Sequence, residues 1–197
     1  MNEENRRISR HMDSFSYLSV ILSIVLGLAI TQVLLGLRGL ILTRAKVKLY
    51  PPTLIWAGIA LLTPIQAWWA DFALRKQPNW TFLALLVIML QAISIYMIAA
   101  LVFPDITGEN FVDLREHFFA HRSWFFSAMF ASVVFSLLKT LALHGHLPNL
   151  VDSTFEFIFG AVAVAAALTR SEWFHKFLAP AAGIMFVVYI ALLFARL

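Results

Sequence analysis

Cysteine is absent from the 197 residues of this chain. Disulfide bonds, thiolate metal ligands, thiol catalysis and S-acylation are therefore excluded. Charged residues are also scarce: they make up 13% of the chain, against roughly a quarter in an ordinary globular domain. The sequence contains no Walker loop, no dinucleotide-binding fingerprint, no haem-attachment motif and no GxSxG nucleophile elbow. Because no catalytic constellation is visible, we expect neither an enzyme nor a bound cofactor.

Apolar residues are abundant instead. They make up 61% of the chain, and the mean hydropathy is +0.82. A surface of this composition is wetted by lipid, because a soluble domain needs far more charge on its surface. Apolar runs of about 20 residues recur, which is the length that crosses roughly 30 Å of hydrocarbon. The sequence predicts an all-α, polytopic transmembrane helical bundle with about six spans, surrounded by lipid in the cell (inner) membrane.

The expected layout is a polar N-terminal tail, residues 1–13, followed by one transmembrane domain, residues 14–197. The expected spans are residues 15–42, 52–72, 80–103, 123–143, 150–168 and 173–194. Prolines stand at several of the breaks, and tryptophan and tyrosine gather near the span ends, where amphipathic rings prefer the headgroup layer. The first run is too long for a signal-peptide core, so we interpret it as a retained span.

A polar segment, residues 105–122, separates the third span from the fourth. Phe111, Leu114 and Phe118 recur in it at helical spacing. This pattern predicts a short amphipathic helix that lies in the membrane interface.

The chain is basic, with a formal charge of +4 and a sequence pI of about 9.7. Its lysine and arginine residues are scattered in short loops beside apolar spans, where they contact lipid headgroups, so nucleic acid is not an expected partner. With six spans, seven of these residues fall on the side of both termini and eight on the other, which accounts for all 15. A distribution this even predicts no orientation.

The two halves of the chain share some spacings. Trp80 and Tyr96 in the third span are as far apart as Trp173 and Tyr189 in the sixth. The same holds for three hydroxyl residues of the first and fourth spans: Ser14, Ser23 and Thr31 against Ser123, Ser132 and Thr140. A duplicated three-helix unit would give a 3+3 inverted repeat, as in many secondary transporters. The alternative is a chance alignment of apolar spans with aromatic ends, and both interpretations stay open.

Polar side chains inside a span are costly, so each is a candidate for function. Gln32, Gln66 and Gln91 place one amide in the middle of each of the first three spans. Such amides either hydrogen-bond between helices or line a path through the membrane.

Charged side chains near the fourth and fifth spans are stronger candidates. Lys139 lies near the end of the fourth span, and Asp152 and Glu156 share one face at the start of the fifth. We predict that Lys139 pairs with Glu156, either as a static tie or as part of a proton or ion path. Asp71, at the edge of the second span, is expected to cap the helix or to pair with Arg75.

Weak candidates for a metal site lie around the polar segment. Asp113, His117 and His121 fall on one face of the predicted interfacial helix, and His175 is expected on the same side of the bilayer. Two histidines four residues apart on a helix can share a zinc ion. Solvated interfacial histidines are common, however, and no HExxH pattern supports a site, so no metal is assigned.

Glycine, alanine and valine make up nearly all of residues 160–167 in the fifth span. Small residues let helices approach closely, within one chain or between chains. The leading interpretation is a small transporter or permease-like protein for a solute or ion. The alternatives are a structural or assembly subunit, which packs with copies of itself or with partner membrane proteins, and an oligomeric ion channel. A polar cavity at mid-depth favours transport, whereas a dry core favours assembly.

Overall fold

The computed structural model describes residues 3–77, 80–106 and 111–194, with side chains for 15–75, 77, 80–106 and 111–192. The helices are α1 (Glu3–Leu42), α2 (Pro51–Asp71), α3 (Phe82–Leu101), α4 (Leu114–His144), α5 (Leu150–Leu168) and α6 (Glu172–Phe194). Short 3₁₀ turns occupy Arg44–Lys46 and Phe72–Lys76, and the strands β1 (Val47–Lys48) and β2 (Val112–Asp113) have two residues each. The predicted all-α bundle is confirmed: in this part of the chain six helices are long and apolar enough to cross a bilayer.

The helix ends follow local sequence signals. Thr81 accepts a hydrogen bond from the Ala84 amide at the start of α3, and Asn149 does the same for the Asp152 amide at the start of α5. Gly145 ends α4 with a positive φ of 72°, a conformation that glycine adopts without a steric penalty. α1 already begins at Glu3, so helix extends through most of the predicted polar tail.

The separate interfacial helix expected before the fourth span is not formed. α4 runs without a break from Leu114 to His144, so the polar segment supplies its first turns. Leu114 and Phe118 are buried in the bundle core, while Phe111 is exposed. Leu114 and Phe118 thus pack against other helices of the bundle, since an apolar side chain can be buried in a protein core as well as in the membrane interface.

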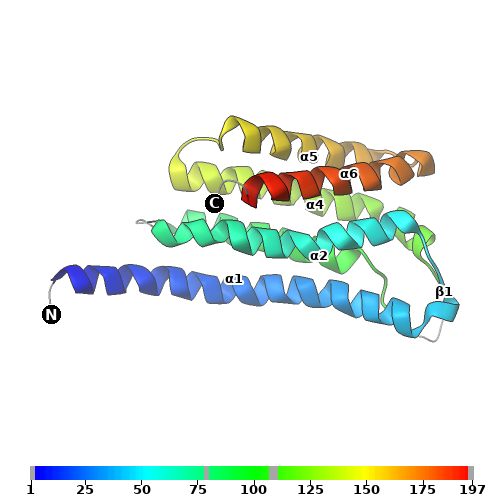
Figure 1. The fold of residues 1–197 in the computed structure, drawn as a ribbon, viewed down its shortest axis with the longest axis horizontal. Coiled ribbons are helices and arrows are strands. Elements are labelled where there is room, and N and C mark those ends of the chain that lie inside the picture. Colours follow the sequence, from blue (N-terminus) through cyan, green and yellow to red (C-terminus); the bar gives the residue numbers. More distant parts are fainter. Residues whose placement is uncertain (1–2, 78–79, 107–110, 195–197) are drawn as a thin grey trace.

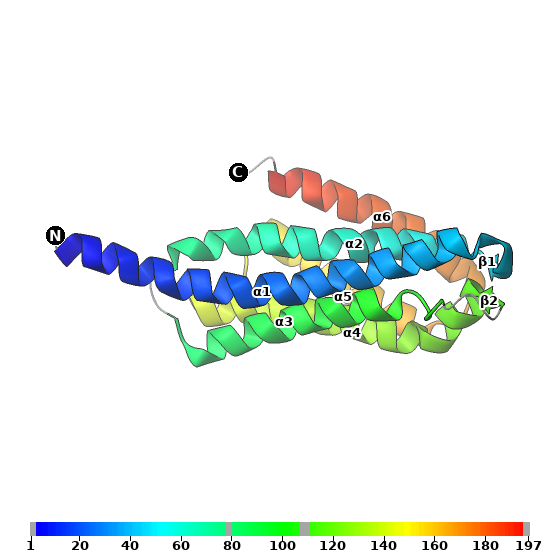
Figure 2. The ribbon, with the colours of Figure 1, turned by 90° about the horizontal axis from the view of Figure 1, so that it is seen from below.

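The six helices form two groups along the chain (Figure 1). α1, α2 and α3 all pack against one another, α4 packs against α3 and α5, and α6 has its main helix contact with α2. We call the end of the bundle where α2, α4 and α6 begin the β end, and the opposite one the terminal end. Figure 2 shows α6 diverging from its neighbours toward the terminal end. These contacts do not follow the same pattern in both halves, and the inverted repeat stays a prediction.

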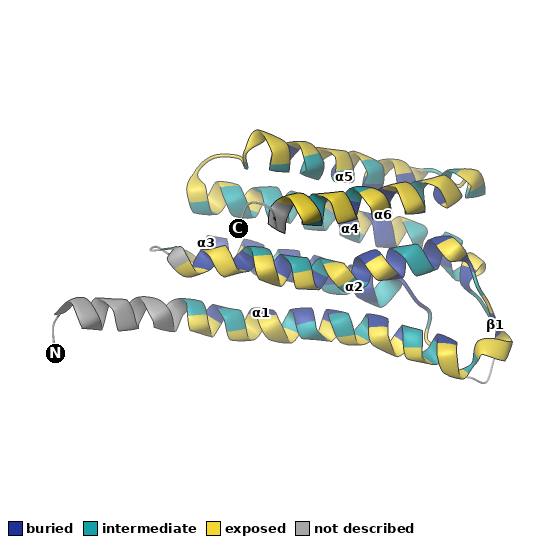
Figure 3. Ribbon diagram, viewed as in Figure 1, coloured by how far each residue is buried: buried dark blue, intermediate teal, exposed yellow. Residues whose placement is uncertain are grey.

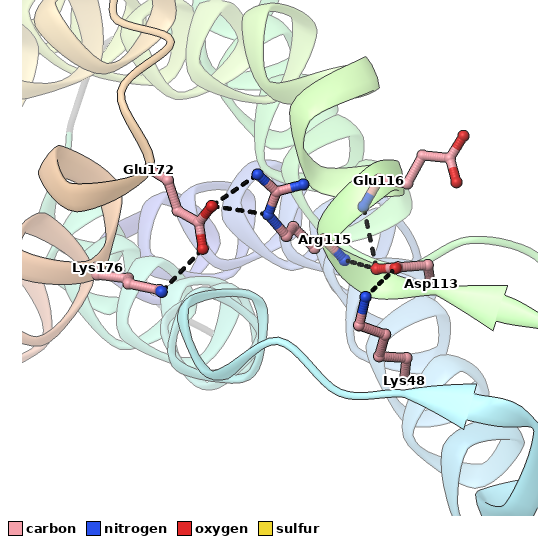
Figure 4. A network of polar contacts seen from close by, with 6 residues as sticks. All are labelled: Lys48, Asp113, Arg115, Glu116, Glu172 and Lys176. Carbon is pink, nitrogen blue, oxygen red and sulfur yellow. Dashed lines mark hydrogen bonds and ion pairs between the residues drawn. The ribbon is translucent and has the colours of Figure 1, made fainter.

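The connections at the β end are fastened to one another. β1 and β2 pair in parallel, with Val47 opposite Val112. Figure 4 shows the charged network beside them: Lys48 contacts Asp113 at 2.9 Å, and Glu172 contacts Arg115 at 2.6 Å and Lys176 at 2.8 Å. The network therefore joins the strand that precedes α2 to the first turns of α4 and α6.

The outer faces of the helices are apolar. Figure 3 shows buried residues on the inward faces and exposed residues on the outward faces. Large side chains such as Phe82, Trp124 and Phe177 are 77%, 71% and 73% exposed. An apolar exterior around a packed core is what lipid contact requires.

Two glycines of α1 lie against the segment that follows α3. A Cβ atom at Gly36 would approach the Phe103 Cβ atom to 2.8 Å, and one at Gly39 would approach the Ile106 Cβ atom to 2.8 Å. Such distances are too short for real side chains, so glycine permits this close approach at the β end.

The Gly36→Ala variant should therefore be less stable than the natural protein. Overpacking of a well-packed site costs about 1–3 kcal/mol of unfolding free energy. Gly27→Ala is the matched control, because a Cβ atom there meets nothing within 4 Å and alanine favours helix. Thermal unfolding of both variants in detergent measures the difference, and equal midpoints would contradict the proposed contact.

A candidate solute-binding cavity

A cavity of about 330 Å³ lies between the two halves of the bundle. Its walls come from α2 and α3 on one side and from α4, α5 and α6 on the other. Along α2 the lining extends from Trp56 to Asp71, a distance of roughly 22 Å at 1.5 Å per residue, and it continues to Leu74 in the 3₁₀ turn that follows. His144 and Pro148 line it at the terminal end.

The polar lining follows from helical spacing. Ser132, Ser136, Lys139 and Thr140 of α4 recur at intervals of three and four residues, so they share one face of that helix. The other hydrogen-bonding or charged side chains in the lining are Thr63, Gln66, Asp71, Gln91, His144, Asp152, Glu156 and Tyr189, besides the indole of Trp56. An apolar helix with one polar stripe turns that stripe away from lipid, which brings these groups together.

Lys139 forms an ion pair in the cavity wall, and its partner is Asp71. The Lys139 Nζ atom lies 2.7 Å from the Asp71 Oδ1 atom, and the two side chains are only 13% and 11% exposed. The predicted pairing with Glu156 is wrong. The prediction compared only consecutive spans, but the ends of α2 and α4 lie next to each other in the cavity wall. Asp71 likewise pairs across the bundle with Lys139 in place of the expected Arg75.

Glu156 is held by a hydroxyl group. The Ser136 Oγ atom donates a hydrogen bond to its Oε1 atom at 2.6 Å. The Oε2 atom is buried and has no hydrogen-bond partner in the part of the chain that the structure describes. Asp152, one turn before Glu156, accepts a hydrogen bond from the side-chain amide of Asn149 at 2.6 Å.

The three predicted glutamines separate into two roles. Gln66 and Gln91 both line the cavity. Gln32 instead donates a hydrogen bond to the Tyr96 hydroxyl at 3.2 Å, joining α1 to α3. Gln32 thus forms a contact between helices, whereas a path through the membrane beside Gln66 and Gln91 stays a prediction.

Aromatic side chains close the cavity toward the β end. Trp56, which is 1% exposed, meets the rings of Phe125 and Phe126 edge-on at centroid distances of 5.7 and 5.1 Å. Phe126 in turn stacks on His175, and Phe118 meets both of these rings. Together these five residues, which we call the aromatic plug, fill the bundle between α2, α4 and α6.

The weak metal candidates are used in other ways. Asp113 caps α4, and the Lys48 ammonium and the first amides of α4 hold the pKa of its carboxyl below its usual value. His175 is fully buried in the aromatic plug and donates a hydrogen bond to the Thr169 carbonyl at 2.8 Å.

The other two histidines lie together on α4. The rings of His117 and His121 stack at a centroid distance of 4.4 Å, and His117 donates a hydrogen bond to the Leu101 carbonyl. Among the described residues no three histidine, aspartate or glutamate side chains gather as metal ligands do. The four candidates therefore do not form a common site in this part of the chain.

The small residues of α5 pack within the chain. Gly160, Ala163 and Ala166 are buried, and a Cβ atom at Gly160 would lie 3.6 Å from the Val133 side chain of α4. This face of α5 thus forms a helix–helix contact inside the bundle.

Six apolar helices with lipid-facing exteriors define a multi-pass membrane protein. No known protein family, characterised protein or solved structure matches the chain. Its function therefore has to be argued from its own cavity.

Sequence reasoning missed the role of Asp71 and of the hydroxyl residues of α4. The signal was present: Ser132, Ser136, Lys139 and Thr140 form a polar stripe on an otherwise apolar helix. The cross-bundle partner of Lys139 left no comparable signal, because nothing in the spacing of one helix indicates which distant helix packs against it.

Removing Lys139 should destabilise the protein. In Lys139→Met the mostly buried Asp71 carboxylate loses its counter-charge, which costs about 3 kcal/mol for a buried pair. Lys176→Met is the matched control, because the exposed Lys176–Glu172 pair contributes no more than about 1 kcal/mol. The test is thermal unfolding in detergent, with Asp71→Asn/Lys139→Met expected to recover part of the loss. Equal effects of the two single variants would show that the Asp71–Lys139 pair is hydrated.

Proposed function

We propose that this protein is a small transporter that binds a solute in the cavity between its two halves and carries it across the membrane. The observation that supports the proposal is a cavity whose largely apolar wall carries a group of polar and charged side chains, within helices that are otherwise apolar. Polar groups at membrane depth are expensive and are typical of substrate or ion pathways. The proposed location is the cell (inner) membrane, with lipid as the surrounding partner.

The depth of the cavity fits this role. Gln91 is the tenth residue of the 20-residue α3, so its amide lies near the middle of that helix. Substrate sites of secondary transporters lie near the bilayer midplane, between the two halves of the bundle. The volume of about 330 Å³ is at the lower end of ligand pockets, which range from roughly 300 to 1,000 Å³, and suits a small molecule.

The two ends of the cavity differ in a way that suits alternating access. At the terminal end the lining includes exposed residues such as His144. Toward the β end the aromatic plug separates the cavity from the opposite face. A transporter closes its site to one side while it is accessible from the other, and a cavity closed at one end supports that proposal.

The alternatives have less support from the described residues. A channel needs a continuous polar route, whereas the aromatic plug crosses the path beyond Trp56. An assembly subunit would use the small residues of α5 on a partner chain, but Gly160, Ala163 and Ala166 pack inside this one.

Single-cysteine variants test the proposal without background, because the natural chain contains no cysteine. Ser132→Cys should react with a membrane-impermeant methanethiosulfonate reagent, because its thiol lies in a hydrated cavity. Ser127→Cys is the matched control: the same substitution on the same helix, at an exposed position on the outer face. It should react at least about tenfold more slowly, since a thiol in an apolar environment does not ionise readily.

The same variants in sealed proteoliposomes test transport. Leu147→Cys and Ser171→Cys, at the terminal and β ends, mark the two faces of the membrane. Ser132→Cys should react with reagent added to either face separately, because the site is exposed alternately. Reaction only from the side of Leu147 would indicate a static pocket and contradict transport. No reaction from either face would indicate a dry core and favour an assembly subunit.

A further inference from the structure

The acidic side chains of the cavity wall have different partners. Among the described residues the lining contains the carboxylates of Asp71, Asp152 and Glu156 and the ammonium of Lys139. Asp71 and Lys139 neutralise each other at 2.7 Å. Glu156 accepts a hydrogen bond from the Ser136 hydroxyl and forms no ion pair within this part of the chain.

The two carboxylates of α5 have different surroundings. Asp152 lies in the first turn of the helix. Its carboxylate accepts a hydrogen bond from the Asn149 side-chain amide, and its backbone amide donates one to the Asn149 side-chain oxygen, which caps the helix. Glu156 lies one turn deeper, and its Oε2 atom is buried without a partner in the described structure. A buried oxygen that lacks a donor costs free energy, so Glu156 is poised to accept a positively charged or hydrogen-bonding group.

Aromatic rings line the same cavity as this carboxylate. Phe155 and Phe159 flank Glu156 on α5 and, with Tyr189 of α6, line the cavity. The Phe155 and Tyr189 rings lie 5.3 Å apart, and the Phe159 and Tyr189 rings lie 6.5 Å apart. The faces of such rings attract cations, and the same rings bind apolar groups.

We propose that the cavity takes an amphiphilic organic cation, an amine or quaternary ammonium with an apolar body, and that Glu156 is the counter-charge that binds its head. The inference rests on the proposed function, which it deepens by naming the class of solute.

Two other classes fit the wall less well. A divalent metal ion needs several oxygen ligands, and the described residues contain no group of three acidic or histidine side chains that could hold one. A small anion would need Lys139, whose ammonium is already paired with Asp71.

The test uses the Ser132→Cys reporter and two reagents of opposite charge. The full chain with Ser132→Cys, in nanodiscs, is treated separately with the cationic trimethylammonium-ethyl and the anionic sulfonato-ethyl methanethiosulfonate. The cation preference is the ratio of the two modification rates, divided by the same ratio at the exposed Ser171→Cys. The cavity should prefer the cation by about tenfold, which corresponds to roughly 1.4 kcal/mol of electrostatic interaction. Benzyltrimethylammonium should slow the modification of Ser132→Cys, and benzylphosphonate at the same concentration should not.

Adding Glu156→Gln to the reporter should reduce the cation preference to within about threefold of the Ser171 reference, because the substitution removes one charge at nearly constant shape. Glu116→Gln is the control, because Glu116 is exposed near the β end of α4. If Glu156→Gln does not fold, the cation preference of Ser132→Cys in the otherwise natural chain tests the proposed solute class.

The outcomes separate the two proposals. Reaction with both reagents at the reference ratio, or protection by benzylphosphonate alone, overturns the cation class and leaves a hydrated solute cavity. Reaction with neither reagent overturns the cavity and the cation class together.

Discussion

The structure depends on one constraint: a polar side chain within a lipid-facing helix has to find its partner inside the protein, because hydrocarbon offers none. Several polar groups of the cavity wall obey it by pairing within the bundle. Lys139 and Asp71 neutralise each other across the bundle, and Ser136 donates to Glu156. The outer surface of the bundle consists mainly of apolar side chains. The proposed function is inferred from the cavity that the polar side chains line.

The two ends of the bundle are held in different ways. At the β end, a strand pair, a charged network and a close glycine contact all join neighbouring segments. The aromatic plug fills the interior next to them. Toward the terminal end the ion pair between Asp71 and Lys139 joins α2 to α4 in the cavity wall, and α6 diverges (Figure 2). The contacts between segments are thus concentrated at the β end, where the aromatic plug closes the cavity.

The spans were predictable because an apolar run of membrane length is a strong local signal, and the start of α5 even matches the predicted residue. The continuation of α4 through residues 114–122 was not, since the same stripe of Leu114 and Phe118 suits either an interface or a core. Gln66 and Gln91 were predicted as candidates because an amide side chain inside a membrane span is energetically costly. The partner of Lys139 was missed because pairing between helices distant in sequence depends on packing that no single helix encodes.

The divergence of α6 has a mechanical consequence. The helix is 23 residues long, or roughly 34 Å at 1.5 Å per residue, and its first turn is fastened through Glu172 to α4. Because this fastening lies at one end of the helix, a tilt of about 5° at the β end would displace the far end of α6 by roughly 3 Å. That displacement is close to the diameter of a water molecule, so small repacking around Glu172 would be enough to widen or narrow the mouth beside Tyr189.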